Sequence, residues 1–208
     1  MRPARATLIW ATFAAAVCVP IAAAAASELL AWRTPVYILA GFAGIVALAL
    51  VLVQPLLIGG YLPGLSATRW RQAHQWVGGA LVVAVVLHVV GLWITSPPDM
   101  IDALLLASPT PFSPFGVISM WAIFAVALLA AFRRRLGLRA RTWRLAHMSL
   151  AVAIVAGGLV HAMLIEGTME WVSKAVLCAL VLMATIKVMA DRRVWRKRAT
   201  PRSEVQQP

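Results

Sequence analysis

Charged residues are scarce in this chain of 208 residues: they make up 12% of it, and only seven are acidic. Hydrophobic residues make up 62%, and the mean hydropathy is +0.86. A soluble domain needs a charged surface, and this composition supplies too little charge to cover so large an apolar mass. The composition therefore excludes an ordinary soluble domain and favours a chain embedded in a lipid bilayer.

Cysteine is also scarce, since Cys18 and Cys178 are the only two, and both lie inside apolar runs. The sequence contains no CxxC pair and no Cys/His spacing of the kind that binds zinc. We interpret both cysteines as small buried hydrophobic residues. They do not reveal a redox compartment.

Long apolar runs, by contrast, are abundant. A helix needs roughly 20 apolar residues to cross the hydrocarbon core of a bilayer. Six runs meet or approach this length, over residues 6–26, 35–58, 72–98, 115–132, 145–165 and 171–190. Lys174 and Lys187 lie near the two ends of the sixth run, from which their side chains can reach the membrane surface. The sequence predicts an all-α membrane protein, a bundle of six transmembrane helices.

The first run has two interpretations. The order of MRPAR, an apolar stretch and AAAAAS resembles a cleaved signal peptide. The apolar stretch spans 21 residues, longer than the roughly 7–15 residues of a typical signal core. We expect a retained helix, and cleavage stays the alternative.

Basic residues are distributed unevenly among the loops. With a cytoplasmic N-terminus, sixteen of the 19 lysines and arginines fall on the cytoplasmic side, and the outer loops contain only Arg33. This asymmetry follows the positive-inside rule and predicts that both termini are cytoplasmic, as in a multi-pass protein of the bacterial inner membrane. The net charge of +12 then serves orientation and contact with membrane lipid, so we expect no nucleic acid partner.

The four histidines of the chain form two pairs with the same spacing: His74 and His88 in the third run, His147 and His161 in the fifth. Fourteen residues of α-helix leave the two rings within about 40° on one face and about 21 Å apart along the axis. The first histidine of each pair ends the same motif, Trp-Arg-x-Ala-His, and the two copies of this motif are 73 residues apart. Because the two helices run in the same direction, His74 should lie level with His147, and His88 level with His161.

Two imidazoles that face each other at one height are the axial ligands that a haem needs between helices. Among Val and Leu, an unpaired imidazole at His88 or His161 would be costly, and coordination to iron removes this cost. Two imidazoles without carboxylate or thiolate make a poor zinc or di-iron site. We therefore predict that the four histidines are iron ligands to two b haems. A lone intramembrane histidine has another common role, in packing or proton transfer.

Glycine and arginine residues near the histidines extend this prediction. Gly78 follows His74 by one turn and Gly157 precedes His161 by one turn, where a flat macrocycle can approach the backbone; ordinary helix packing is the alternative. At the inner level, four arginines are candidates to bind haem propionates, or act only as topology signals: Arg69, Arg71, Arg141 and Arg144.

Three features together resemble the ferric reductase-like transmembrane domain: His-x13-His in the third run, the Arg-rich loop 133–144, and Trp-Arg-Leu-Ala-His at 143–147. This superfamily includes ferric reductases, the membrane part of NADPH oxidases and the haem subunit of the periplasmic methionine sulfoxide reductase system. The resemblance implies an inner haem on His74 and His147 and an outer haem on His88 and His161. It divides the chain into a first helix and outer loop (1–34), the haem-binding transmembrane domain (35–190) and a basic, disordered cytoplasmic tail (191–208).

The resemblance also implies electron transfer across the membrane to an outer acceptor, which is ferric iron, dioxygen or a periplasmic redox protein. The residues after the sixth run contain no GxGxxG and no phosphate-binding cradle, so we expect a separate cytosolic flavoprotein reductase, or a quinol, as donor. The chain is then an oxidoreductase or its electron-transfer subunit. The alternatives are the haem-bearing subunit of a periplasmic reductase complex, which tends to lack one histidine of the third run, and a cofactor-free transporter or structural protein.

Overall fold

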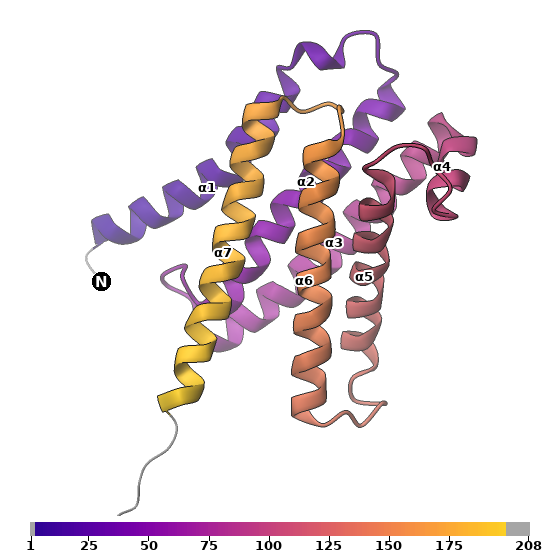
Figure 1. The fold of residues 1–208 in the computed structure, drawn as a ribbon. Helices are drawn as coiled ribbons and strands as arrows, with labels where there is room; N and C mark the ends of the chain where they lie inside the picture. The colour runs from indigo at the N-terminus through magenta and orange to yellow at the C-terminus, as the bar shows by residue number, and fades with distance from the viewer. Residues whose placement is uncertain (1–2, 199–208) are drawn as a thin grey trace, which may run out of the picture.

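The chain folds into a bundle of helices, shown in Figure 1, and the computed structural model describes residues 3–198. No strand occurs in this part of the chain. Six helices are long and apolar enough to cross a membrane, which confirms the predicted all-α architecture. The elements are α1 (Pro3–Ala25), the single turn η1 (Glu28–Leu30), α2 (Pro35–Gly59), α3 (Ala67–Thr95), α4 (Pro97–Leu104), α5 (Ser113–Phe132), α6 (Ala140–Leu164) and α7 (Trp171–Arg198).

Local capping residues set several helix ends. The Thr34 side chain accepts a hydrogen bond from the Tyr37 backbone N–H at the start of α2, and Pro35 occupies the first turn. The same helix ends at Gly60, whose φ of 68° lies in the left-handed region that favours glycine. Ser66 caps α3 in the same way as Thr34 caps α2. These caps turn the chain sharply, so α2 and α3 form an antiparallel hairpin.

Two hairpins make up the centre of the bundle. Helix α2 packs along α3, and α5 packs along α6; α7 lies against α2 and α6, and α1 contacts α7 and α2 (Figure 1). Helices α3 and α6, which contain all four histidines, are not among the pairs of helices in extensive contact. The histidine helices therefore come from different hairpins and face each other across a space that backbone packing does not close.

Apolar side chains fill the bundle and also cover its outside. A buried cluster joins the two hairpins, with Leu81 of α3, Met120 and Ile123 of α5 and Ile154 of α6 among its members. Many large apolar side chains on the long helices are exposed, as a surface in contact with lipid requires.

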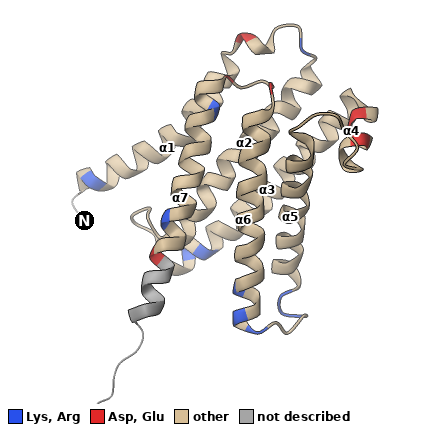
Figure 2. Ribbon diagram, in the orientation of Figure 1, with Lys and Arg blue, Asp and Glu red and all other residues tan. Residues whose placement is uncertain are grey.

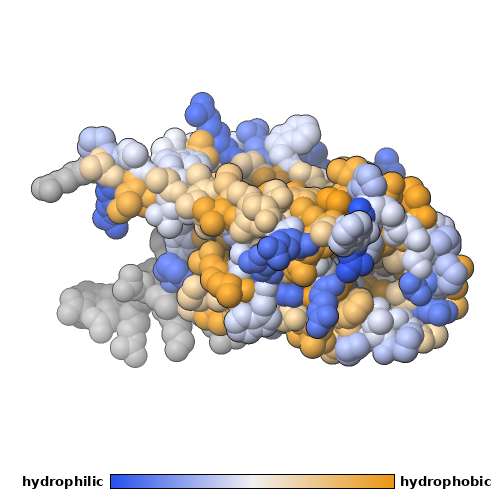
Figure 3. Space-filling model, turned by 90° about the horizontal axis from the view of Figure 1, so that it is seen from above, coloured by the Kyte–Doolittle hydropathy of each residue, from blue (hydrophilic) through white to orange (hydrophobic). Residues whose placement is uncertain are grey.

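Charged residues concentrate at the two ends of the bundle (Figure 2). We call the end with Arg71, Arg144 and the α5–α6 loop the basic end, and the end with α4 and the α6–α7 loop the acidic end. In the view from above (Figure 3), hydrophilic side chains lie across the end face, and hydrophobic ones emerge around them. The cytoplasmic location of the basic end stays a prediction from the sequence.

The structure adds two features to the predicted spans. The short helix α4 lies at the acidic end, where Pro97 occupies its first turn and the Ser96 hydroxyl donates to the Asp99 carboxylate at 2.6 Å. Helix α7 continues to Arg198, eight residues into the segment predicted as a tail from residue 191. The rest of that segment, residues 199–208, lies outside the described residues.

Candidate functional site

The structure brings the four histidines together in two pairs between α3 and α6. The ring centroids of His74 and His147 are 6.1 Å apart, and those of His88 and His161 are 6.4 Å apart. These are the partners that the equal spacing in the two helices predicts. We call the pair at the basic end the inner pair and the other the outer pair.

Both separations fit a single metal ion between the two rings. With metal–nitrogen bonds of about 2.0 Å and ring nitrogens about 1.1 Å from the ring centroid, two imidazoles on opposite sides of one metal have centroids about 6.2 Å apart. No group of three or more His, Cys, Asp or Glu within the described part of the chain is placed to hold a metal ion. A pair of imidazoles therefore suits a metal whose remaining ligands come from a porphyrin.

The outer pair is oriented by two backbone carbonyls. His88 Nδ1 lies 2.7 Å from the Ala40 carbonyl oxygen on α2, and His161 Nδ1 lies 3.0 Å from the Phe112 carbonyl oxygen at the start of α5. A carbonyl only accepts, so each Nδ1–H donates, and each neutral ring keeps its lone pair on Nε2. Histidines that ligate metals are commonly fixed by such a bond from the other ring nitrogen.

Two glycines make room for these rings. A Cβ atom on Gly44 would lie 2.9 Å from His88 Nδ1, and a Cβ atom on Gly116 would lie 2.6 Å from His161 Nδ1. In each hairpin the carbonyl that binds the ring belongs to the residue four positions before the glycine. The two hairpins thus hold their outer histidines in the same way.

Gly44 and Gly116 are not among the residues predicted from the sequence. Their one signal in the sequence is an offset of 72 residues, beside the offset of 73 between the histidines. Glycine is common in transmembrane helices, where it lets neighbouring helices pack closely. The offset alone therefore does not distinguish Gly44 and Gly116 from ordinary packing residues.

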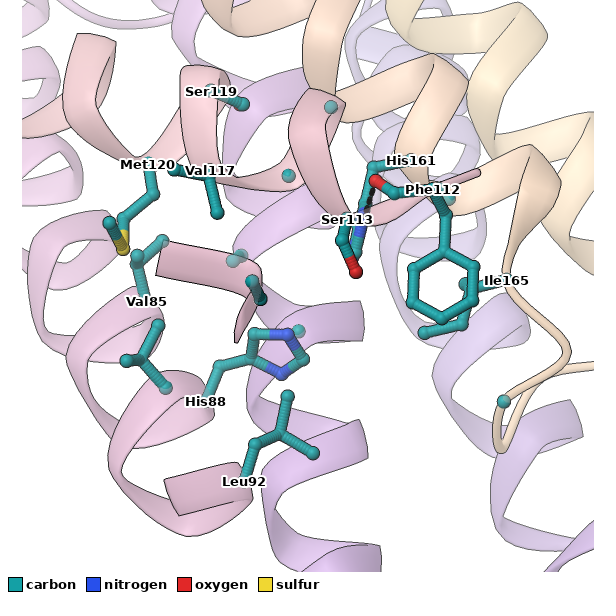
Figure 4. A pocket seen from close by; sticks show the side chains of 18 of the residues that line it. Val85, His88, Leu92, Phe112, Ser113, Val117, Ser119, Met120, His161 and Ile165 are labelled. Atoms are coloured by element: carbon teal, nitrogen blue, oxygen red, sulfur yellow. Dashed lines mark hydrogen bonds between the residues drawn. The ribbon is translucent and has the colours of Figure 1, made fainter. Parts of the chain in front are cut away.

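A cavity of about 550 Å³ opens between the hairpins at the level of the outer pair, and both His88 and His161 line it (Figure 4). Its wall near the rings is largely apolar and includes Val85, Leu92, Val117 and Met120. Toward the acidic end the lining becomes polar. An apolar slot with a polar rim suits the shape and chemistry of a haem, whose ring is apolar and whose propionates are charged.

The inner pair has different surroundings. The Trp143 ring lies against His147, with centroids 5.2 Å apart, and the Arg133 guanidinium lies over Trp143 at 4.9 Å. Neither His74 nor His147 lines the cavity of the outer pair. At the inner pair, an aromatic neighbour therefore packs on the His147 ring.

Comparison with known proteins agrees with this geometry. The family model described as ferric reductase like transmembrane component matches residues 40–158, more than half of the chain. The chain belongs to the ferric reductase-like transmembrane family. The match includes His74, His88 and His147 and ends three residues before His161. No curated protein and no solved structure is significantly similar to the chain.

The two glycines predicted from the sequence lie in contacts between helices of this ferric reductase-like bundle. A Cβ atom on Gly157 would lie 2.8 Å from the Phe115 carbonyl oxygen, so Gly157 lets α6 approach the backbone of α5. Gly78 faces the Gln54 side chain of α2. Gly157 does not line the cavity of the outer pair, and the structure places it in helix packing, the alternative to contact with a macrocycle. The role of Gly78 beside the inner pair stays a prediction.

The predicted arginines lie at the basic end, as expected from their positions in the helices. Arg71 and Arg144 are exposed near the starts of α3 and α6, three residues before His74 and His147 respectively. Arg69 and Arg141 are exposed as well. Their role toward propionates stays a prediction.

Proposed function

We propose that this protein carries electrons across the membrane through two b haems, one held by His74 and His147 and one by His88 and His161. The observation that carries the proposal is the presence of two imidazole pairs, at separations of 6.1 and 6.4 Å, along the same two helices. Domains of this family generally bind haem.

The histidines determine what kind of chemistry is available. A bound haem would supply one-electron redox chemistry, and the two histidines of each pair would be the residues that hold it. The protein therefore acts by positioning and by electrostatics. The Nδ1 hydrogen bonds to Ala40 and Phe112 fix the outer rings for this purpose.

The two sites lie one above the other along the bundle. Fourteen residues of α3 separate His74 from His88, which corresponds to about 21 Å along the helix axis. Between these levels lies the apolar cluster around Leu81, Met120 and Ile154. These apolar side chains also form part of the wall of the outer cavity, and the two sites lie toward opposite ends of the bundle.

The ends of the bundle support different partners. Arginines 133–144 at the basic end suit an acidic surface or an anionic headgroup, so the proposed donor is a separate cytosolic flavoprotein reductase, or a quinol. The proposed acceptor at the acidic end is ferric iron, dioxygen or a periplasmic redox protein. In this account the chain resides in the bacterial inner membrane.

A vesicle experiment tests the function directly. Purified protein is inserted into liposomes that enclose ferricyanide, and dithionite, which does not cross the bilayer, is added outside. We expect reduction of the enclosed ferricyanide to depend on the protein and to be abolished by His88→Ala. If wild-type vesicles reduce the enclosed ferricyanide no faster than protein-free vesicles, the proposal is contradicted.

A further inference from the structure

Lys174 of α7 is a buried cation at the acidic end of the bundle. Its side chain is 6% exposed, and its Nζ donates to the Ile165 carbonyl oxygen at 2.6 Å. From the sequence, we expected the Lys174 side chain to extend to the membrane surface. Lys187, the other lysine predicted in this span, does reach an exposed position: its side chain is 61% exposed and pairs with Asp191. Lys174 instead points inward, because the carboxyl end of α6 offers it an acceptor.

The charge of Lys174 is not balanced by a carboxylate. Within the part of the chain that the structure describes, Lys187–Asp191 is the one ion pair. An ammonium group has three N–H donors, and the Ile165 carbonyl accepts from one of them. Burial of an ammonium without an anionic partner is costly, so this site favours an anion.

The same side chain lines the cavity that contains His88 and His161. Among the described residues that line this cavity, Lys174 is the one lysine or arginine. The lining also includes two carboxylates, Asp99 and Asp102, neither of which forms an ion pair with Lys174. The apolar wall, the two imidazoles and the buried cation together match a molecule with an apolar ring, a metal centre and a carboxylate.

We propose that the Lys174 ammonium binds a propionate carboxylate of the haem held by His88 and His161. This inference rests on the proposed function, since it requires the outer haem. The propionate then lies at the acidic end of the bundle, whereas the arginines that the sequence suggested as propionate partners lie at the basic end. The positive charge also stabilises the bound molecule and raises the midpoint potential of its iron, because reduction adds a negative charge nearby.

A purely structural role for Lys174 makes a different prediction. Ile165 is the C-cap of α6, and a cation there complements the helix dipole and satisfies a carbonyl. Lys174→Gln keeps an N–H donor and removes the charge, whereas Lys174→Met removes both. A role in capping alone would spare Lys174→Gln, whereas binding of a carboxylate would not.

The test uses the full-length protein in detergent, with Lys174→Gln, Lys174→Met, Lys174→Arg and the matched control Lys187→Gln on the same helix. Two quantities are measured for the outer haem: its midpoint potential and its rate of transfer to apomyoglobin. We expect Lys174→Gln and Lys174→Met to lower the midpoint potential of the outer haem. Both should also increase its rate of transfer to apomyoglobin by about tenfold or more, which corresponds to the free energy of one charge-assisted hydrogen bond. Lys174→Arg and Lys187→Gln should stay near wild type.

A second measurement needs no substitution: wild-type protein loaded with haem dimethyl ester, which lacks the carboxylates, should release it as fast as Lys174→Gln releases haem. Slow release of the ester, or wild-type behaviour of Lys174→Gln, would overturn this inference while leaving the proposed function intact. Wild-type protein without any bound haem would overturn the proposed function, and this inference with it.

Discussion

The outer and inner histidine pairs have nearly the same ring separation but are supported in different ways. Each outer ring is held inside the bundle by a carbonyl of the partner helix in its own hairpin and by a glycine beside it. The inner pair lies at the basic end, where Trp143 packs on His147 and the arginines are exposed. The comparison teaches that the outer imidazoles are oriented by backbone carbonyls of their own hairpins, which leaves the other nitrogen of each ring available to a metal.

The largest effect should come from removing an outer ligand. His88→Ala or His161→Ala should reduce the haem content from two per chain to one, since one imidazole holds the iron far less well than two. Haem quantitation by the pyridine haemochrome method measures this. Loss of both haems, or of neither, would break the division into two independent sites.

A glycine substitution should produce the next largest effect, and only at the outer site. In Gly116→Ala the new Cβ would lie 2.6 Å from His161 Nδ1, so the ring must move and its hydrogen bond to Phe112 must lengthen. We expect weaker haem binding by about tenfold or more, the cost of overpacking a tight contact. Gly79→Ala on α3, where no atom lies within 4 Å of the added Cβ, serves as the matched control and should bind both haems normally.

The inner site should respond to its aromatic neighbour. Trp143→Ala removes the ring that packs against His147, and we expect inner haem binding to weaken by about threefold to tenfold. Titration of the two haems in reduced-minus-oxidised spectra separates them. Trp121→Ala is the control, because Trp121 is 57% exposed on α5 and packs on Phe124 instead; an equal loss in this variant would remove the inferred role of Trp143.

The smallest effect should come from the exposed arginines. Arg71→Gln or Arg144→Gln should weaken binding of the inner haem by less than about fivefold, because solvent and salt screen an exposed charge pair. The effect should shrink further at high salt. A large loss at the outer haem, measured in the same spectra, would contradict the assignment of these residues to the basic end.

Much of the fold could be predicted from the sequence, because hydropathy and chain length decide which segments cross a bilayer. The predicted second span, 35–58, differs from α2 by one residue at its carboxyl end. The pairing of the histidines followed from the same logic, since 14 residues of helix bring two side chains to one face.

The supporting residues could not be predicted, because they depend on contacts between helices. Gly44 and Gly116 matter through rings that lie 44 and 45 residues further along the chain. Lys174 was expected at the membrane surface, and only the position of the α6 carboxyl end shows why it turns inward. Hydropathy does not report which neighbour a side chain will meet.

The central claim, two imidazole pairs that each hold one haem, is tested most directly by haem quantitation and reduced-minus-oxidised spectroscopy of the purified wild-type protein. The account predicts two b haems per chain, both low-spin with six ligands to iron. A colourless preparation, or a single haem per chain that persists in both His88→Ala and His74→Ala, would contradict it.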